Sequence, residues 1–297
     1  MKFLIVGASG FIGRHTLAYA KSLGHDSLGT RYQSEYPGLI TFDLLRHRIK
    51  DCIDVSFYET DEPVYGVICA TFSQIDRCYR ERELSSLLNV ENTIRLILDL
   101  KDLGIKPVFL SSSFVYDGNI GYYDEECPPN PINEYGRHKV MVENFINHNT
   151  PNVLILRLDK IVGDDPLEHH LFSEWYQCIR ENQPITCIEG QLISPTLVKD
   201  VAKAVIMSCQ QGLTGLYNVA NSEFFTRGEL AKQFTLALGK EAKIICKPQK
   251  EFNFADQRPL KSYLDSTKFV KITGITFTSM REVFKVFIDK IQSGEGE

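Results

Sequence analysis

The chain has 297 residues, 43% of them apolar, which is enough for one large α/β domain or for a nucleotide-binding domain with a smaller lobe. The formal net charge of −5 argues against a nucleic-acid-binding surface, although a helix end can still attract an anionic ligand. The first apolar run stops at Gly7, far short of the roughly 20 residues of a membrane span. We therefore expect a cytoplasmic protein with no membrane or nucleic-acid partner.

The eight cysteines form no C-x-x-C pair, and no histidine cluster lies beside them at zinc-ligand spacing. This pattern favours reduced thiols in a cytosolic protein and predicts no metal site. The seven histidines are scattered, and His169-His170 is better explained as a surface pair than as part of a ligand set.

Short apolar runs alternate with amphipathic stretches over the first half of the chain. In chain order we expect strands over residues 2–6, 26–29, 39–42, 64–70, 107–110 and 153–158, and helices over 11–23 and 84–103. This alternation indicates βαβ units, and hence an α/β fold with a Rossmann-type doubly wound parallel sheet. Such sheets bind ligands at the carboxyl ends of their strands.

Beyond about residue 160 the alternation loosens. We expect helices over 167–180, 199–209, 227–238 and 279–291, and a last strand over 216–219. These elements predict a dinucleotide-binding domain over residues 1–160 and a substrate-binding lobe over 161–297. A segment of that lobe, about 192–220, is expected to return to the first domain.

A glycine-rich turn, Gly7-Ala8-Ser9-Gly10-Phe11-Ile12-Gly13, follows the first strand. In a dinucleotide-binding turn the first glycine permits the sharp bend, the second lets the pyrophosphate approach, and the third allows close packing of helix on strand. An ordinary strand-to-helix turn is the alternative. The strand before and the amphipathic helix after the glycines favour the dinucleotide motif.

The second strand ends in Gly29-Thr30-Arg31, where an NAD site usually has an acid. Arg31 suits a ribose 2′-phosphate, so we expect NADP, with NAD as the alternative cofactor and a solvated surface arginine as the alternative role. Asp43 is a candidate partner for the adenine, or a helix cap. The predicted cofactor-binding residues are Gly7, Ser9, Gly10, Phe11, Ile12, Gly13, Arg31, Asp43, Leu44, Ala70, Thr71, Tyr135 and Lys139.

Tyr135 and Lys139 lie four residues apart in a stretch of helical character, so they share one helix face. A nearby ammonium is expected to lower the tyrosine pKa, so that Tyr135 can exchange a proton in a carbonyl–alcohol interconversion. A serine of the run 111–113, directly after a strand, can hydrogen-bond the reacting oxygen. A packing tyrosine with a solvated lysine is the bland alternative. A serine hydrolase is disfavoured because no G-x-S-x-G elbow is present.

At these motifs the chain resembles the extended short-chain dehydrogenases/reductases, and within them the dTDP-4-dehydrorhamnose reductase type. Aligned on Val115-Tyr116, the resemblance places the catalytic hydroxyl on Ser112. The further segments that carry it are Pro131 to Lys139, Ile75-Asp76-Arg77, Asn89-Val90, Ser194-Pro195-Thr196, Asp200-Val201-Ala202, Arg258-Pro259, Ser262 and Leu264-Asp265. The dehydratases of the group have an Asp-Glu pair where Ser113-Phe114 stand, which counts against dehydration.

The resemblance implies an oxidoreductase with the catalytic residues Ser112, Tyr135 and Lys139. Its substrate is expected to be a nucleotide-linked 4-keto-6-deoxy sugar held by Ser112, Ser113 and Arg258, with Arg258 on the diphosphate. Two alternatives stay open: an NAD-dependent nucleotide-sugar epimerase, and a dinucleotide-binding regulatory subunit without turnover. A homodimer is also compatible with the resemblance.

Overall fold

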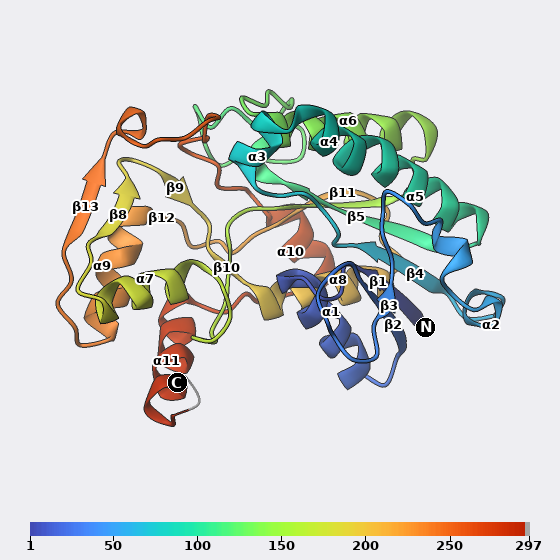
Figure 1. Cartoon of the computed structure of the whole chain (residues 1–297), viewed down its shortest axis with the longest axis horizontal. Helices are drawn as coiled ribbons and strands as arrows, with labels where there is room; N and C mark the ends of the chain where they lie inside the picture. The colour runs from blue at the N-terminus through green and yellow to red at the C-terminus, as the bar shows by residue number, and fades with distance from the viewer. Residues whose placement is uncertain (295–297) are drawn as a thin grey trace.

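The computed structural model describes residues 1–294, and a seven-stranded sheet forms its centre (Figure 1). All neighbouring strands run parallel. Their spatial order is β11 (Gly215–Val219), β6 (Leu154–Leu158), β5 (Lys106–Ser112), β4 (Val64–Ile68), β1 (Lys2–Val6), β2 (Asp26–Arg31) and β3 (Ile40–Thr41). The order 3-2-1-4-5-6, extended by β11, confirms the predicted Rossmann-type doubly wound sheet.

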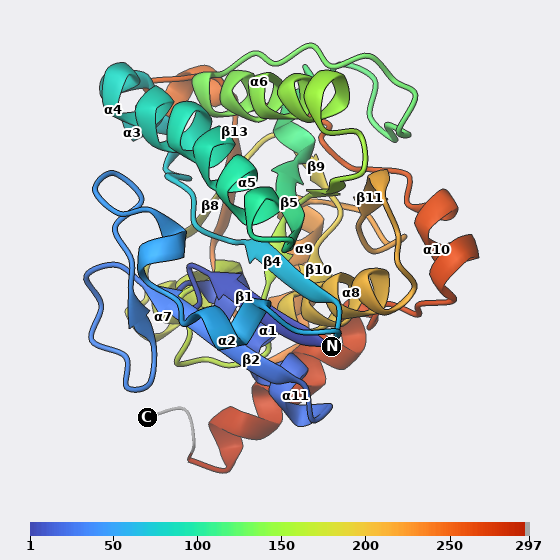
Figure 2. The ribbon, with the colours of Figure 1, turned by 90° about the vertical axis from the view of Figure 1, so that its right-hand side faces the viewer.

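Helices cover both faces of this sheet, as Figures 1 and 2 show. Because successive strand residues point to opposite faces, Phe3 and Ile5 join one apolar cluster while Leu4 and Val6 join the other. The first cluster includes α1 (Phe11–Ser22) and α8 (Val198–Gln210), and the second includes α2 (Val55–Tyr58), α5 (Asn92–Asp102) and α6 (Glu134–Asn149). Strands buried on both faces explain why these runs are almost continuously apolar.

The sequence predicts one helix over 84–103, but the structure divides this stretch. Helices α3 (Ile75–Arg80) and α4 (Arg82–Ser86) lead into a turn of π-helix, Leu87–Glu91, before α5 begins. The wider turn places the buried Asn89 side chain against the loop after β4, where Asn89 Oδ1 accepts from the Phe72 N–H at 2.8 Å. The irregular helix therefore supports a loop at the carboxyl end of the sheet.

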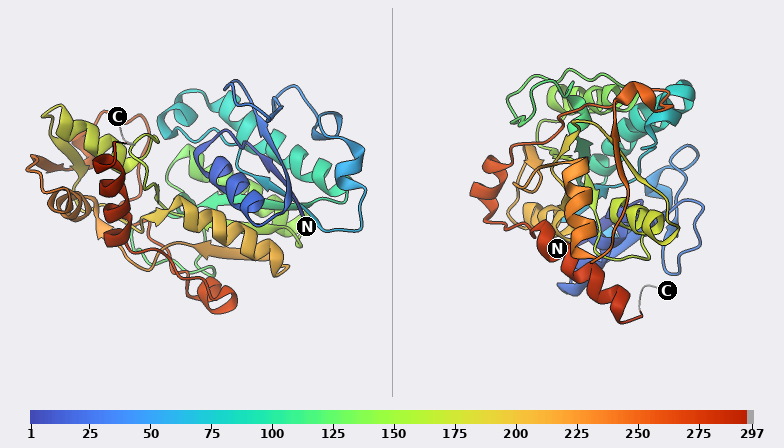
Figure 3. Two further views of the ribbon diagram at one scale, coloured as in Figure 1. Left: turned by 90° about the horizontal axis from the view of Figure 1, so that it is seen from below. Right: turned by 90° about the vertical axis from the view of Figure 1, so that its left-hand side faces the viewer.

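The last third of the chain builds a smaller body at one end of the sheet (Figure 3). Its core is aromatic, with Phe172, Phe234, Phe284 and Phe287 packed together. It contains α7 (Leu171–Arg180), α9 (Arg227–Ala237), α11 (Met280–Gln292) and the parallel pair β8 (Ile185–Ile188) and β13 (Ile244–Lys247). Two short pairings, β7 (Ile161–Val162) with β10 (Thr196–Leu197) and β9 (Leu192–Ile193) with β12 (Phe225–Thr226), stand beside it.

The predicted last strand does return to the central sheet. Strand β11 pairs with β6, and α8 packs along α1, far from it in the sequence. Helix α10 (Thr267–Thr273), which the sequence analysis does not foresee, packs on β11. The division into residues 1–160 and 161–297 stays a prediction, and residues 295–297 lie outside the described part of the chain.

The cysteines carry free thiols throughout. Cys78, Cys187 and Cys209 are buried, whereas Cys246 is exposed. Within residues 1–294 we find no helix with both the length and the apolar character that crossing a bilayer requires.

Candidate functional site

The glycine-rich turn is held tightly between neighbouring strand ends. Gly7 has a φ of 87°, and a Cβ there would lie 2.7 Å from the backbone nitrogen of Ala70. A Cβ at Gly13 would collide with the carbonyl oxygen of Gly7. The Gly7 N–H donates to the Thr30 hydroxyl at 3.0 Å, which fixes the turn against β2. Only glycine permits this bend and this close approach of helix to strand.

The first turn of α1 is suited to an anion. Gly10 is its N-cap and has no side chain that could cap the helix, and no acidic residue occupies the first turn. The N–H groups of this turn are therefore available to a ligand, and the helix dipole adds positive potential at the same point.

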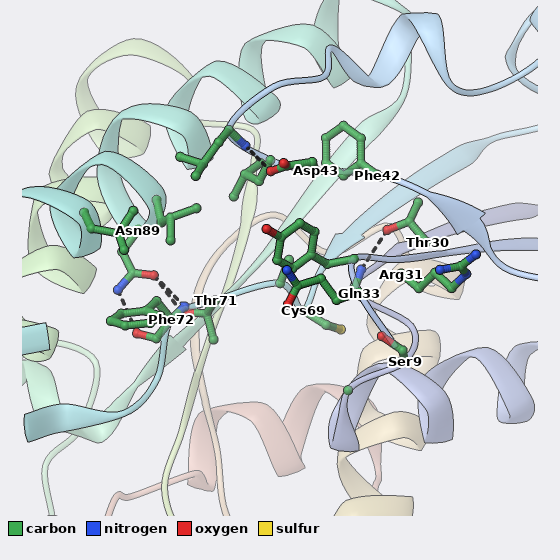
Figure 4. Close-up of a pocket in the computed structure, with 18 of the residues that line it drawn as sticks. Ser9, Thr30, Arg31, Gln33, Phe42, Asp43, Cys69, Thr71, Phe72 and Asn89 are labelled. Atoms are coloured by element: carbon green, nitrogen blue, oxygen red, sulfur yellow. Dashed lines mark hydrogen bonds between the residues drawn. The ribbon is translucent and has the colours of Figure 1, made fainter. Parts of the chain in front are cut away.

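A cavity of about 550 Å³ lies at the carboxyl ends of β1, β2 and β4 (Figure 4). The predicted cofactor residues that line it are Gly7, Ser9, Gly10, Arg31, Asp43, Leu44, Ala70 and Thr71. The other lining residues were not predicted to bind the cofactor; they are Thr30, Tyr32, Gln33, Phe42, Leu45, Cys69, Phe72, Arg77, Leu84, Leu88 and Asn89. Arg77 and Asn89 lie in segments that carry the family resemblance. The only sequence signal of the rest is their position after a strand, or on the helix that follows.

Arg31 lies at this cavity with unused hydrogen-bonding capacity. Its Nη1 donates to the Ser34 carbonyl at 3.3 Å, while its buried Nε has no partner among the described residues. Asp43 is partly engaged, since its Oδ1 accepts from the Leu45 N–H at 2.9 Å. Asp43 therefore stabilises a turn as well as lining the cavity, and Arg31 keeps donors for an anionic group.

A second cavity of about 360 Å³ adjoins the first, with which it shares Gly10, Cys69 and Thr71. Three predicted cofactor residues, Phe11, Ile12 and Gly13, line it together with the three predicted catalytic residues, Ser112, Tyr135 and Lys139. A ligand that extends from the first cavity into the second thus reaches all three catalytic candidates.

The start of α6 brings Tyr135 close to Ser112, the last residue of β5. Asn133 caps the helix, because its Oδ1 accepts from the Gly136 N–H at 2.8 Å. A Cβ at Gly136 would collide with the carbonyl oxygen of Phe114, so this glycine allows the helix to abut the segment after β5. The sequence analysis assigned no role to Gly136, although it lies inside the Tyr-Gly-x-x-Lys motif.

Lys139 lies one helical turn after Tyr135 and is buried. Its Nζ donates to the Leu110 carbonyl at 2.8 Å and lies 5.4 Å from the centroid of the Tyr135 ring. Burial lowers the pKa of Lys139 to about 8, against the opposing influence of the Glu143 carboxylate. The ammonium is thus close to its own titration point at neutral pH.

Burial also shifts Tyr135, in a direction that corrects the sequence-based expectation. The pKa of Tyr135 is raised by burial, although the hydroxyls of Thr71 and Ser112 act as hydrogen-bonding partners that lower it. The expectation that Lys139 lowers this pKa below its ordinary value is wrong, because the loss of hydration of a phenolate outweighs its other interactions here. Tyr135 therefore carries its proton at neutral pH, as a proton donor must, although the raised pKa also makes it a weaker acid.

A buried ion pair holds α6, which carries the two predicted catalytic residues Tyr135 and Lys139, against the sheet. Glu143 accepts from Arg157 at 2.5 and 3.0 Å and from the Ser111 hydroxyl at 2.5 Å. Arg157 also donates to the Tyr116 hydroxyl at 2.5 Å. This network fixes α6 against β5 and β6, and the position of Glu143, four residues after Lys139, is its one sequence signal.

Ser113 does not line the second cavity, but Asp159 does. The Ser113 hydroxyl donates to Asp159 Oδ1 at 2.7 Å, and the Ser262 hydroxyl donates to the same oxygen at 2.9 Å. The Ser194 N–H donates to Oδ2 at 2.6 Å. Burial raises the pKa of Asp159, and these donors oppose the shift. Ser113 thus orients a carboxylate that the sequence analysis did not identify.

Arg258 lies outside both cavities and is already paired. Its Nη2 donates to Asp76 Oδ1 at 2.9 Å, and its Nη1 donates to the Asp256 carbonyl at 2.8 Å. The Asp256 carboxylate in turn accepts from the Glu134 N–H at 2.8 Å, at the start of α6. The arginine therefore joins the C-terminal segment to α3 beside the start of α6.

Known proteins resemble this chain in sequence over most of their length. The probable low-salt glycan biosynthesis reductase Agl14 of Haloferax volcanii is 26% identical over 89% of this chain and 90% of its own. Methionine adenosyltransferase 2 subunit beta of Xenopus tropicalis is 27% identical over 91% of this chain and 81% of its own.

Solved structures that share the fold of this chain include dTDP-4-dehydrorhamnose reductases. A hypothetical dTDP-4-dehydrorhamnose reductase from Sulfolobus tokodaii superposes with a TM-score of 0.80 at 26% identity, over 94% of this chain and 97% of its own. The NADP complex of the Bacillus anthracis dTDP-4-dehydrorhamnose reductase does so with 0.82 at 21% identity, over 97% and 99%. The model of the RmlD substrate binding domain matches residues 1–293. The chain therefore belongs to the RmlD substrate binding domain family, which confirms the resemblance found in its sequence.

Proposed function

We propose that this protein reduces the keto group of a nucleotide-linked 4-keto-6-deoxy sugar with a hydride from NADPH. The observation that carries the proposal is the second cavity, where Ser112, Tyr135 and Lys139 converge on a space shared with the glycine-rich turn. Its relationship to nucleotide-sugar reductases supports the substrate class.

The residues of the cavity divide the work of a carbonyl reduction. The bound cofactor supplies a hydride to the carbonyl carbon. Ser112 donates a hydrogen bond to the carbonyl oxygen, and Tyr135 delivers the proton that this oxygen needs as it becomes an alcohol. The Lys139 ammonium, 5.4 Å from the Tyr135 ring centroid, stabilises the phenolate that is left. A tyrosine with a raised pKa is a source of this proton across the neutral range.

Arg31 supports NADP as the cofactor, because its free Nε and the lack of an acid in the last three residues of β2 suit a 2′-phosphate. The Bacillus anthracis reductase was solved with NADP, which agrees with this choice. NAD is the alternative cofactor, and its use would fit a second candidate function, that of a nucleotide-sugar epimerase.

A regulatory subunit without turnover is a third candidate function. It is favoured by the 27% identity to methionine adenosyltransferase 2 subunit beta. The presence of serine, tyrosine and lysine together at the second cavity favours catalysis instead.

The deciding experiment follows NADPH absorbance after addition of dTDP-4-keto-6-deoxy sugars to the native protein and to Tyr135→Phe. Loss of the general acid should slow turnover by about 10² to 10⁴ with cofactor affinity retained. Tyr122→Phe, at an exposed tyrosine, is the matched control and should behave as native.

One outcome would remove Tyr135 from the mechanism, and two others would contradict the reductase. Turnover above about half of the native rate in Tyr135→Phe excludes Tyr135 as the acid, given the usual size of this effect. Tightly bound NAD that is never consumed while sugars interconvert identifies an epimerase. Binding of dinucleotide without turnover identifies the regulatory subunit.

A further inference from the structure

Two cations, Lys160 and Arg227, lie along one segment at the edge of the smaller body. The Lys160 carbonyl accepts from the Thr196 N–H at 2.9 Å, and the Arg227 N–H donates to the Gln191 carbonyl at 2.9 Å. The two residues are thus anchored to opposite ends of the short stretch that contains β9 and β10. Positions 67 residues apart in the chain are brought together in this way.

Neither cation has an acidic partner. No carboxylate oxygen within residues 1–294 lies within ion-pair distance of either side chain. Arg227 Nη1 has only a 3.3 Å hydrogen bond to Gln191 Oε1, and its buried Nε has no partner in the described chain. The carboxylates of Glu174 and Asp159 raise the pKa of Lys160 from beyond ion-pair distance. Glu174 is half-exposed and pairs with His169 at 3.4 Å, and Asp159 accepts from Ser113, Ser194 and Ser262.

This arrangement is unfavourable unless an anion completes it. Burial lowers the pKa of Lys160 to about 8, and the positive charge of Arg227 lowers it further. Burial also lowers the pKa of Arg227. Both residues are half-buried, and the Arg227 Nε atom is fully buried. Cations withdrawn from water are normally paired, so two like charges without an ion pair indicate a site whose counter-charge comes from outside the chain.

The pair lies next to the reaction site. Lys160 lies between Asp159 and Ile161, which both line the second cavity. The side chains of Lys160 and Arg227 lie outside the two cavities, beyond this wall. On the other side, Gln191 Nε2 donates to the Pro259 carbonyl at 3.2 Å, so the segment also contacts the neighbour of Arg258. A substrate whose reacting carbon lies in the second cavity would extend its remaining groups toward this segment.

We propose that Lys160 and Arg227 form an anion-binding subsite for the substrate, which the proposed function requires to be a nucleotide sugar. The shared chemistry is a pair of anionic oxygens, and two parts of such a molecule supply it: the diphosphate, or a carboxylate carried by the sugar. Arg258, which is paired with Asp76, is not needed for this charge.

The test measures ligand binding to Lys160→Met and Arg227→Gln by calorimetry at saturating NADP. The ligands are dTDP and UDP, followed by the glucose and glucuronic acid conjugates of whichever nucleotide binds the native protein more tightly. Lys232→Met, exposed on the same helix α9, and Arg180→Gln, exposed on α7, are the matched controls. Lys160→Arg keeps the charge and should retain binding.

We expect each charge-removing variant to weaken binding by about tenfold or more, the size expected for one hydrogen bond to a charged group. A loss for the nucleotide and both conjugates identifies the diphosphate as the bound group. A loss for the glucuronic acid conjugate alone identifies a sugar carboxylate. The melting temperature should stay equal or rise, since an unpaired charge is removed, whereas a structural role would lower it.

Dissociation constants within threefold of native for all ligands would overturn the subsite. If native turnover of a keto-sugar is then intact, only this inference fails. If the native protein binds neither nucleotide nor conjugate, the proposed function fails with it. If a variant melts well below the native protein, the substituted cation has a structural role, which contradicts the proposal.

Discussion

Tyr135 and Lys139 lie on consecutive turns of α6, and burial moves both toward their neutral forms. The pKa of the phenol is raised and that of the ammonium is lowered to about 8. Because the phenol keeps its proton while the amine is close to losing one, the lysine is the group of this pair whose charge changes first as pH rises. The pH dependence of both activity and stability should therefore show the titration of Lys139.

We predict that kcat/KM for keto-sugar reduction falls as pH rises through about 8, where Lys139 loses its charge. The same shift affects folding. The pKa of Lys139 is about 8 in the folded protein and 10.5 in the unfolded chain. The unfolded chain therefore binds more protons between these two pH values, and the free energy of unfolding rises with pH there. The gain, up to about 3 kcal/mol by this linkage, should be absent in Lys139→Met.

Urea unfolding of both proteins from pH 7 to 10.5 checks this prediction. Lys160, whose pKa burial lowers in the same way, contributes equally to both proteins and cancels in the difference. Parallel stability curves over this interval would show that Lys139 titrates normally.

A second prediction at this scale concerns Arg31, whose Nε has no partner in the described chain. We expect the native protein to bind NADPH more tightly than NADH. Arg31→Ala should narrow the gap by about 1.5–3 kcal/mol, the usual size of a hydrogen bond to a charged group. Fluorescence titration with both cofactors measures this, with the exposed Arg80→Ala as control. Equal affinities in the native protein would refute the assignment.

At the scale of elements, periodicity predicts what is long and regular. The expected helix over 11–23 is α1 (Phe11–Ser22), and the expected strand over 2–6 is β1 with the same bounds. The two-residue strands β7, β9, β10 and β12 were not foreseen, because two residues carry no period and their pairing is decided by distant segments. The π-helical turn before α5 was missed for a similar reason, since amphipathic spacing hardly distinguishes it from an α-helix.

The residues of the candidate site likewise divide into those that local sequence predicts and those that distant contacts decide. Ser112, Tyr135 and Lys139 belong to local motifs at strand and helix ends, so the sequence suffices to nominate them. Asp159 and Lys160 follow β6 without any motif, and their importance emerges only when Ser113, Ser194 and Arg227 come to lie beside them. Tertiary contacts, which a single sequence does not contain, decide that part of the site.

At the scale of the whole molecule, Arg258 joins the C-terminal segment to α3 through Asp76. The sequence analysis assigned this arginine to the substrate diphosphate. We predict that Arg258→Ala raises KM for the nucleotide sugar at least tenfold while leaving KM for NADPH within twofold, through lost binding or a displaced segment.

Asp76→Asn distinguishes these two causes, since it releases the segment but keeps the guanidinium. A similar rise of KM in both variants assigns Arg258 to positioning the segment, and a rise in Arg258→Ala alone assigns it to the substrate. Steady-state titrations that overlay the native curves for Arg258→Ala would remove it from either role.

The return of β11 and α8 to the central sheet has a consequence for the synthesis of the protein. Strand β11 at one edge of the sheet and helix α8, which packs on α1, come from residues 198–219. Part of the smaller body, including α7 and β8, precedes them in the chain. Once the first 160 residues have emerged from the ribosome, they provide six strands of a sheet whose edge at β6 is unpaired and whose face under α1 is only half covered. Exposed edges and apolar faces of this kind promote aggregation. We therefore expect the emerging chain to depend most on chaperones after residue 160 has emerged and before residues 198–219 have followed.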